Sequence, residues 1–180
     1  MLNVGFSIYY FIFGFVTKSW WLLTLGTYYM FLSVVRFFVL QSKENKNVVI
    51  RFTGTMLILL SVPLGGTVIL SAMRDRGQKF HMIVMIAIAA YSFTKITVAI
   101  INFVKSHRST SAKVTAQRNI AVADAFVSIF ALQRSMLVTF EGMTESEILL
   151  FNIITGMVVW VIVLWLGIRL INNKTILKRN

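Results

Sequence analysis

The sequence predicts an all-α integral membrane bundle of six transmembrane helices, or of five if the first apolar run does not cross, with both termini cytoplasmic. Three observations predict this class: charged residues make up only 13% of the chain, the mean hydropathy is +0.78, and the apolar residues form long continuous runs. Soluble domains carry about 25% charged residues. Lipid admits only helices and closed barrels, and these runs are too continuously apolar for barrel strands. We expect a single transmembrane domain over residues 1–180.

Five runs reach the length of about 20 residues that a helix needs to cross about 30 Å of hydrocarbon. They cover residues 20–40, 52–70, 80–104, 119–140 and 148–171. A sixth run, residues 2–16, is shorter and would form roughly 23 Å of helix. It fits a short span, a re-entrant segment or an interfacial anchor. Lys18 and Ser19 leave room only for a very tight turn before the next helix.

Basic residues between the runs predict the orientation. Ten of them fall in the gaps 41–51 and 105–118 and in the C-terminal tail, which six spans place on one side of the membrane. The other side receives four, at Lys18 and in the gap 71–79. The positive-inside rule makes the first side cytoplasmic, and we expect a multi-pass protein of the cell membrane. The net charge of +12 then indicates attraction to the lipid bilayer and its anionic headgroups, not to nucleic acid, because no nucleic-acid-binding module is recognisable.

The composition excludes several chemistries. The chain has no cysteine, which excludes disulfides, thiolate catalysis and cysteine-based metal sites. The two histidines, His81 and His107, lie on different segments. Asp124 is the one acidic residue within an apolar run, whereas a catalytic dyad needs two groups in one site. We therefore expect no metal, no cofactor and no enzymatic activity.

Lys95 and Asp124 are the strongest candidates for a functional site, because ionisable groups at membrane depth are costly and need a partner. Lys95 lies nine residues before the end of its run, and Asp124 lies five residues after the start of the next. Consecutive helices run antiparallel, so the two side chains lie at similar depth. We predict an ion pair between them.

Small and polar residues share the helical faces of this pair. At about 100° per residue, one stripe comprises His81, Ser92, Lys95, Ala99, Asn102 and Ser106. The other comprises Gln117, Ala121, Asp124, Ser128, Ala131 and Ser135. Such stripes permit close packing and interhelical hydrogen bonds, and they equally fit the lining of a water-filled path. The pair is therefore either a contact that holds two helices together or a site for a substrate, an ion or a proton.

Four further polar side chains lie within the runs. Arg134 lies six residues from the outer end of its run, and we expect it to extend outward to headgroups or to pair with an outer acid such as Glu141. Arg36 and Arg169 lie near cytoplasmic ends and are expected to reach the headgroups there. Asn152 is expected either to bond across helices or to line a cavity.

Pro63 is followed closely by Gly65 and Gly66 within the run 52–70. Proline removes a backbone hydrogen bond and clashes with the preceding turn, so we expect a kink and a candidate hinge. Broken helices near the midplane form binding sites in many transporters. An ordinary kink relieved by neighbouring helices is the alternative.

Aromatic residues concentrate in the N-terminal third of the chain. They include Tyr9, Tyr10, Trp20, Trp21, Tyr28 and Tyr29. An interface belt or a packing cluster is favoured over an aromatic ligand-binding box.

Two segments, TKSWWLLTLGTYYMFLSVVRF and RNIAVADAFVSIFALQRSMLVTFEG, resemble an uncharacterised family of small multi-pass membrane proteins of Gram-positive bacteria. The resemblance covers most of the chain. It implies no assigned activity and transfers no catalytic or binding residue. It also implies a longer N-terminal segment in the relatives.

Two functions fit the sequence. A small transporter or channel would use a polar network, with the proline segment as hinge, and a substrate or proton would compete for Asp124 and release Lys95. The network residues are Ser92, Lys95, Asp124, Ser128, Arg134 and Asn152. The alternative is a non-catalytic scaffold or partner subunit of a membrane complex, with the stripes as packing faces. The expected protein partner is a second copy of the chain or another membrane subunit.

Overall fold

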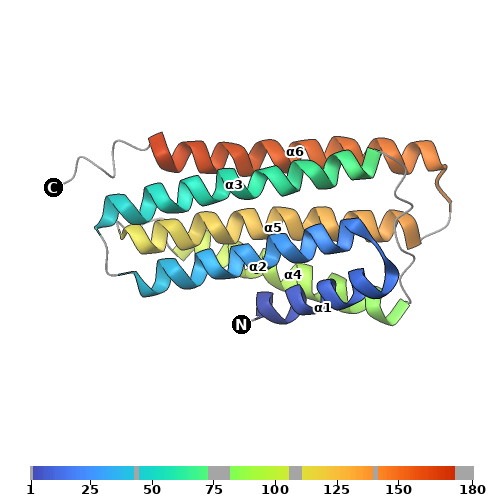
Figure 1. The fold of residues 1–180 in the computed structure, drawn as a ribbon, viewed down its shortest axis with the longest axis horizontal. Coiled ribbons are helices and arrows are strands. Elements are labelled where there is room, and N and C mark those ends of the chain that lie inside the picture. The colour runs from blue at the N-terminus through green and yellow to red at the C-terminus, as the bar shows by residue number, and fades with distance from the viewer. Residues whose placement is uncertain (1, 43–44, 73–81, 106–110, 140–141, 173–180) are drawn as a thin grey trace.

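The computed structural model describes residues 2–42, 45–72, 82–105, 111–139 and 142–172. They form six helices: α1 (Leu2–Thr17), α2 (Trp20–Gln41), α3 (Lys46–Ala72), α4 (Met82–Lys105), α5 (Ala112–Thr139) and α6 (Glu145–Asn172). No strand occurs in these ranges. The predicted all-α bundle is confirmed (Figure 1).

Three helices begin before the apolar runs that predicted them. α3 begins at Lys46, α5 at Ala112 and α6 at Glu145, ahead of residues 52, 119 and 148. Apolar runs mark the hydrocarbon layer, whereas a helix can continue among headgroups, where charged side chains are solvated. In α6 a capping box decides the start, because the Glu147 carboxylate accepts from the Thr144 backbone N–H at 2.8 Å.

The first helix is too short to count among the spans. Five described helices are long and apolar enough to cross a membrane. α1 is also apolar, but it has only 16 residues. α1 begins near the middle of the bundle's length and runs beside α2 (Figure 1). The turn between them is as tight as predicted: Lys18 adopts φ 51°, and the Ser19 N–H donates to the Gly14 carbonyl at 3.0 Å.

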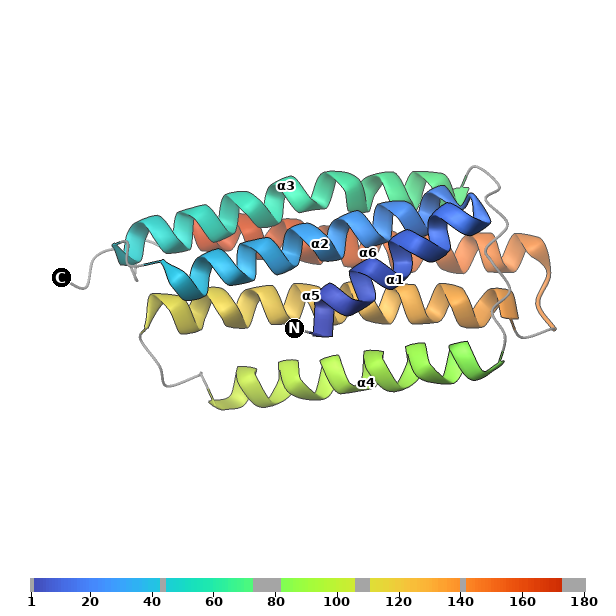
Figure 2. The same cartoon turned by 60° about the horizontal axis from the view of Figure 1, so that its bottom comes forward.

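α5 is the central helix of the bundle. It contacts α2, α3, α4 and α6, while α3 and α6 lie side by side. α4 is peripheral and, in the described part of the chain, packs chiefly against α5 (Figure 2). The helix ends that border the gaps 41–51 and 105–118 gather with the end of α6 at one end of the bundle, as the predicted orientation requires (Figure 1). Which end is cytoplasmic stays a prediction.

Glycines bring α3 and α6 into close contact. A Cβ placed on Gly54 would lie 2.8 Å from the backbone oxygen of Gly167, and one on Gly167 would lie 3.0 Å from that of Gly54. A Cβ on Gly156 of α6 would lie 2.8 Å from Cγ2 of Val68. Membrane helices associate through such small residues, because lipid supplies little hydrophobic drive for helix pairing.

α3 continues as one helix from Lys46 to Ala72 with Pro63 inside it, and the hinge at Pro63 stays a prediction. Trp160 of α6 donates its indole N–H to the Ser61 carbonyl at 2.9 Å, and the Ser61 hydroxyl donates to the Ile58 carbonyl at 2.6 Å. Side chains thus bond to backbone carbonyls in the turn that proline disturbs. The helix is supported there by its neighbour, as in the alternative of a relieved proline.

The outside of the bundle is apolar. Large apolar side chains such as Phe37, Ile83 and Val62 are mostly exposed, and similar residues occur on every described helix. A soluble monomer rarely carries apolar patches of this extent. Together with the five helices of spanning length, this surface makes the chain a membrane protein.

Candidate functional site

The candidate site is centred on Asp124, in the middle of the central helix α5. Its side chain is only 4% exposed. Ser128 and Ala131 on the same face are also buried, and their small size lets neighbouring helices approach closely. A carboxylate in such a place requires charged or hydrogen-bonding partners.

Lys95 of α4 supplies the predicted partner. Its Nζ donates to Asp124 Oδ1 at 2.6 Å, and its side chain is 9% exposed. The predicted ion pair is therefore present, and the matched depth of the two antiparallel helices is confirmed. The pair connects the peripheral helix to the central one.

Arg36 of α2 is a second cation at the same carboxylate. Its Nη2 lies 3.5 Å from Asp124 Oδ2, and its side chain is 34% exposed. The expectation that Arg36 only reaches the headgroups is corrected, because one side of the guanidinium turns toward α5. Arg36 lies four residues before the end of the run 20–40, which matches the depth of Asp124, so this signal was already in the sequence. We call Arg36, Lys95 and Asp124 the charge cluster.

Tyrosine rings enclose the Lys95 ammonium. Nζ lies 3.9 Å from the ring centroid of Tyr29 and 4.4 Å from that of Tyr91. Tyr10 of α1 stacks on Tyr29 with centroids 5.8 Å apart. The faces of aromatic rings attract cations, and the attraction is strongest where water is excluded. These buried tyrosines form a packing cluster and not an interface belt, and nothing in the sequence predicted their contact with Lys95.

Two serines link the helices around the cluster. The Tyr29 hydroxyl and Ser128 Oγ lie 3.1 Å apart, and Ser128 Oγ donates to the Asp124 carbonyl at 2.7 Å. Ser92 Oγ donates to the Ser128 carbonyl over a longer distance of 3.4 Å. The structure therefore brings Ser92 and Ser128 together with Lys95 and Asp124, as the stripes predicted.

The stripe on α4 is only partly buried. Ser92 and Ala99 face inward, whereas Asn102 is exposed. His81 and Ser106 lie outside the described residues. The inward face is therefore shorter than predicted.

Arg134 and Asn152 do not join the charge cluster. Arg134 lies ten residues after Asp124, about 15 Å along the helix axis. Gln133 Nε2 donates to Thr155 Oγ1 at 3.0 Å, which places Asn152, one turn before Thr155, level with that far part of α5. Both side chains are buried.

The expectation that Arg134 extends outward is wrong. The residue is only 2% exposed, and its guanidinium lies 4.8 Å from the centroid of the buried Trp21 ring. Trp20, by contrast, is 71% exposed and fits the predicted interface position. The suggested acid partner Glu141 lies outside the described residues.

Of the proposed hinge residues, Gly65 faces α6. A Cβ on Gly65 would lie 3.1 Å from Nε1 of Trp160, whereas one on Gly66 would meet nothing within 4 Å. With Pro63 inside a continuous helix, this segment forms part of the α3–α6 contact.

The charge cluster holds two cations and one anion, a formal excess of one positive charge. Two buried donors beside it, the Tyr28 hydroxyl and Arg36 Nε, have no hydrogen-bond partner among the described residues. Tyr28 lies within electrostatic range of both Asp124 and Arg36. A carboxylate with aromatic faces around it recognises cations, and here a lysine of the chain itself occupies that position.

Within the described ranges, no three His, Asp or Glu side chains gather as a metal site would require. No protein-family model, curated protein or solved structure matches the chain. The resemblance to membrane proteins of Gram-positive bacteria stays a prediction, and the site is interpreted from its own chemistry.

Proposed function

We propose that the protein is a small, non-enzymatic transporter of the cell membrane in which a proton or a cationic substrate competes with Lys95 for Asp124. The observation that carries the proposal is the contact of 2.6 Å between Lys95 Nζ and Asp124 Oδ1, beside the rings of Tyr29 and Tyr91. The carboxylate and the rings form a site for one cation. The Lys95 ammonium is then a resident cation that a substrate can replace.

Charge balance favours such an exchange. If a monovalent cation enters and the displaced Lys95 ammonium releases its proton to water, the site keeps the same net charge. The exchange then avoids burying an additional charge, which would cost several kcal/mol. One proton leaves for each cation that binds, so a proton gradient can drive the substrate.

The position of α4 supports a moving role for this helix. α4 packs chiefly against α5 among the described residues, and Lys95 is its ionic contact with that helix. Replacement of Lys95 at Asp124 removes this contact. The remaining helices are held by α5 and by the glycine contact of α3 with α6. α4 therefore opens or closes the site, while the other helices stay in place.

Proteoliposomes with a trapped pH-sensitive dye test the proposal. We expect external sodium, potassium or a small alkylammonium ion to drive proton movement through the wild type. Lys95→Ala and Asp124→Asn should abolish that movement, while Arg169→Gln, a change outside the site, should retain it. Proton movement that persists in both site variants would overturn the proposal. The proposal would also be overturned if folded wild-type protein showed no proton movement with any of these cations.

A scaffold or partner subunit is the second candidate. It is favoured by the low exposure of the ion pair, because a pair closed off from water fits a contact that holds helices together. In that case a partner of fixed stoichiometry should copurify from native membranes, and the charge variants should no longer copurify with it. The wild type should then show no cation-driven proton movement.

A further inference from the structure

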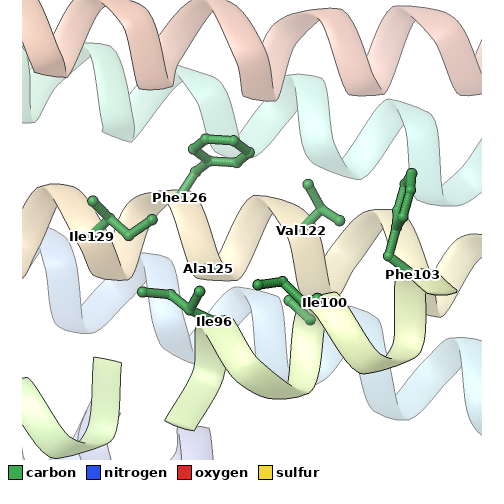
Figure 3. A pocket seen from close by; sticks show the side chains of 8 residues that line it. Ile96, Ile100, Phe103, Val122, Ala125, Phe126 and Ile129 are labelled. Atoms are coloured by element: carbon green, nitrogen blue, oxygen red, sulfur yellow. The ribbon is translucent and has the colours of Figure 1, made fainter. Parts of the chain in front are cut away.

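An apolar groove lies between α4 and α5 on the outside of the bundle, apart from the charge cluster. Its volume is about 280 Å³, and only apolar side chains line it. Its two sides include Ile96, Ala99 and Phe103 of α4 and Val122, Ala125 and Ile129 of α5. Figure 3 shows Ile96 and Phe103 of α4 beside Val122 and Ile129 of α5.

A basic residue stands at one end of this groove. Arg118 precedes Val122, Ala125 and Ile129 at helical spacings of four, seven and eleven residues, so it shares their face of α5. Its guanidinium carbon lies 5.4 Å from the ring centroid of Phe103, a groove residue. The charge of Arg118 and the apolar groove therefore lie in line along α5, over about 16 Å from Arg118 to Ile129.

We propose that the groove binds one acyl chain of an anionic phospholipid whose phosphate contacts Arg118. Membrane helices run across the bilayer, as acyl chains do, so a chain fits lengthwise between α4 and α5. Arg118 lies near the start of α5, at the end of the bundle that the basic gaps predict to be cytoplasmic. Basic sites between helices on that side bind anionic headgroups, and arginine suits phosphate because it can donate two parallel hydrogen bonds.

The groove chemistry favours a lipid over a polypeptide segment. An irregular peptide would place backbone N–H and C=O groups against side chains that offer no hydrogen bond. An apolar helix would fill the groove without using the charge of Arg118. A phospholipid matches both parts, since it joins a hydrocarbon chain to an anion. This inference does not depend on the transporter proposal.

A second arginine in the chain provides a matched control. Arg169, near the end of α6, lies 5.0 Å from the Trp165 ring centroid and so resembles the pair of Arg118 and Phe103. Neither Arg169 nor Trp165 lines the groove. General attraction between basic residues and anionic lipid should involve both arginines, whereas a lipid site in the groove should involve only Arg118.

Native mass spectrometry of the full-length protein in detergent tests the site, with phosphatidylglycerol and phosphatidylcholine as probes. We expect the wild type to bind one phosphatidylglycerol about fivefold more tightly than phosphatidylcholine, the effect of one basic residue near an anionic lipid. Arg118→Gln should remove this preference. Ala125→Leu, which fills the groove, should weaken both lipids. Arg169→Gln and Ala90→Leu, an exposed position on α4 outside the groove, should bind like the wild type.

Three results would overturn the inference. They are equal binding of the two lipids by the wild type, equal losses in Arg118→Gln and Arg169→Gln, and unchanged binding in Ala125→Leu. Helicity and thermal melting establish that each variant is folded. If Ala125→Leu does not fold, Ala99→Leu narrows the groove from α4, and unchanged binding in that variant contradicts the site equally.

Discussion

The α3–α6 contact and the charge cluster hold helices together by different physical means. α3 and α6 meet through glycines, with backbone oxygens where side chains would otherwise lie. In the charge cluster, α2, α4 and α5 meet through three charges and a shell of tyrosines. Packing of small residues does not respond to protons or ions, whereas an ion pair can exchange its partner. We therefore expect α3 and α6 to stay fixed and α4 to be the helix that responds.

The largest effect on stability should follow from Asp124→Ala. This change leaves the Lys95 ammonium buried without its carboxylate, and removing one partner of a buried pair costs about 3–5 kcal/mol. Arg36, with a third of its side chain exposed, can reach the membrane surface. Unfolding titrations in detergent micelles measure the loss of free energy.

The double variant Asp124→Ala/Lys95→Met separates stability from function. Removing both charges should recover most of the lost free energy, because a buried pair contributes little beyond apolar packing. Cation-driven proton movement should stay absent. A double variant as unstable as the single one would show that the cluster is needed to hold α4 in place.

A smaller effect should follow from Gly54→Ala at the α3–α6 contact. The new Cβ would lie 2.8 Å from the Gly167 backbone oxygen, which cannot move without shifting the helix. Overpacking of this kind costs about 1–3 kcal/mol. Proton movement should persist in protein that remains folded, because the change lies outside the charge cluster.

Gly66→Ala is the matched control on the same helix. Its Cβ would meet nothing within 4 Å, so the free energy of unfolding should stay equal or rise by up to about 1 kcal/mol. Equal losses in Gly54→Ala and Gly66→Ala would mean that glycine acts through the backbone of α3 and not through contact with α6.

The smallest effect should come from two adjacent tyrosines. Tyr29→Phe removes the hydroxyl that bonds to Ser128, and such interhelical bonds in membranes average about 0.6 kcal/mol. Tyr28→Phe removes a buried hydroxyl that has no hydrogen-bond partner in the described structure, so it should cost nothing or stabilise the protein. Thermal unfolding of both variants measures the difference, and a larger loss in Tyr28→Phe would contradict the geometry.

The sequence predicted much of the fold and part of the site. Run lengths gave the spanning helices, and Lys18 with Ser19 predicted the turn that the structure contains. Counting residues from the ends of two runs placed Lys95 beside Asp124. The same count applies to Arg36, which was overlooked because nearness to a helix end also suits a side chain that reaches headgroups.

One sequence prediction failed, and one contact in α3 could not be predicted, because both depend on a neighbouring helix. Arg134 is buried against Trp21 instead of extending outward, and distance from a helix end does not tell which way a side chain points. α3 remains continuous through Pro63, where Trp160 bonds to the Ser61 carbonyl in the preceding turn. The indole belongs to α6, and nothing near Pro63 in the sequence indicates it.

The sequence by itself determined that five helices can cross the membrane and at what depth their charges lie. Both follow from the thickness of the hydrocarbon layer and the rise of the helix. Only the tertiary structure decided which helices are neighbours and which face of each points inward. Lipid is as apolar as the protein interior, so a residue facing lipid and one facing another helix can have the same hydrophobicity. For that reason the sequence revealed a pair at Asp124, and the structure revealed a cluster of three charges enclosed by tyrosines.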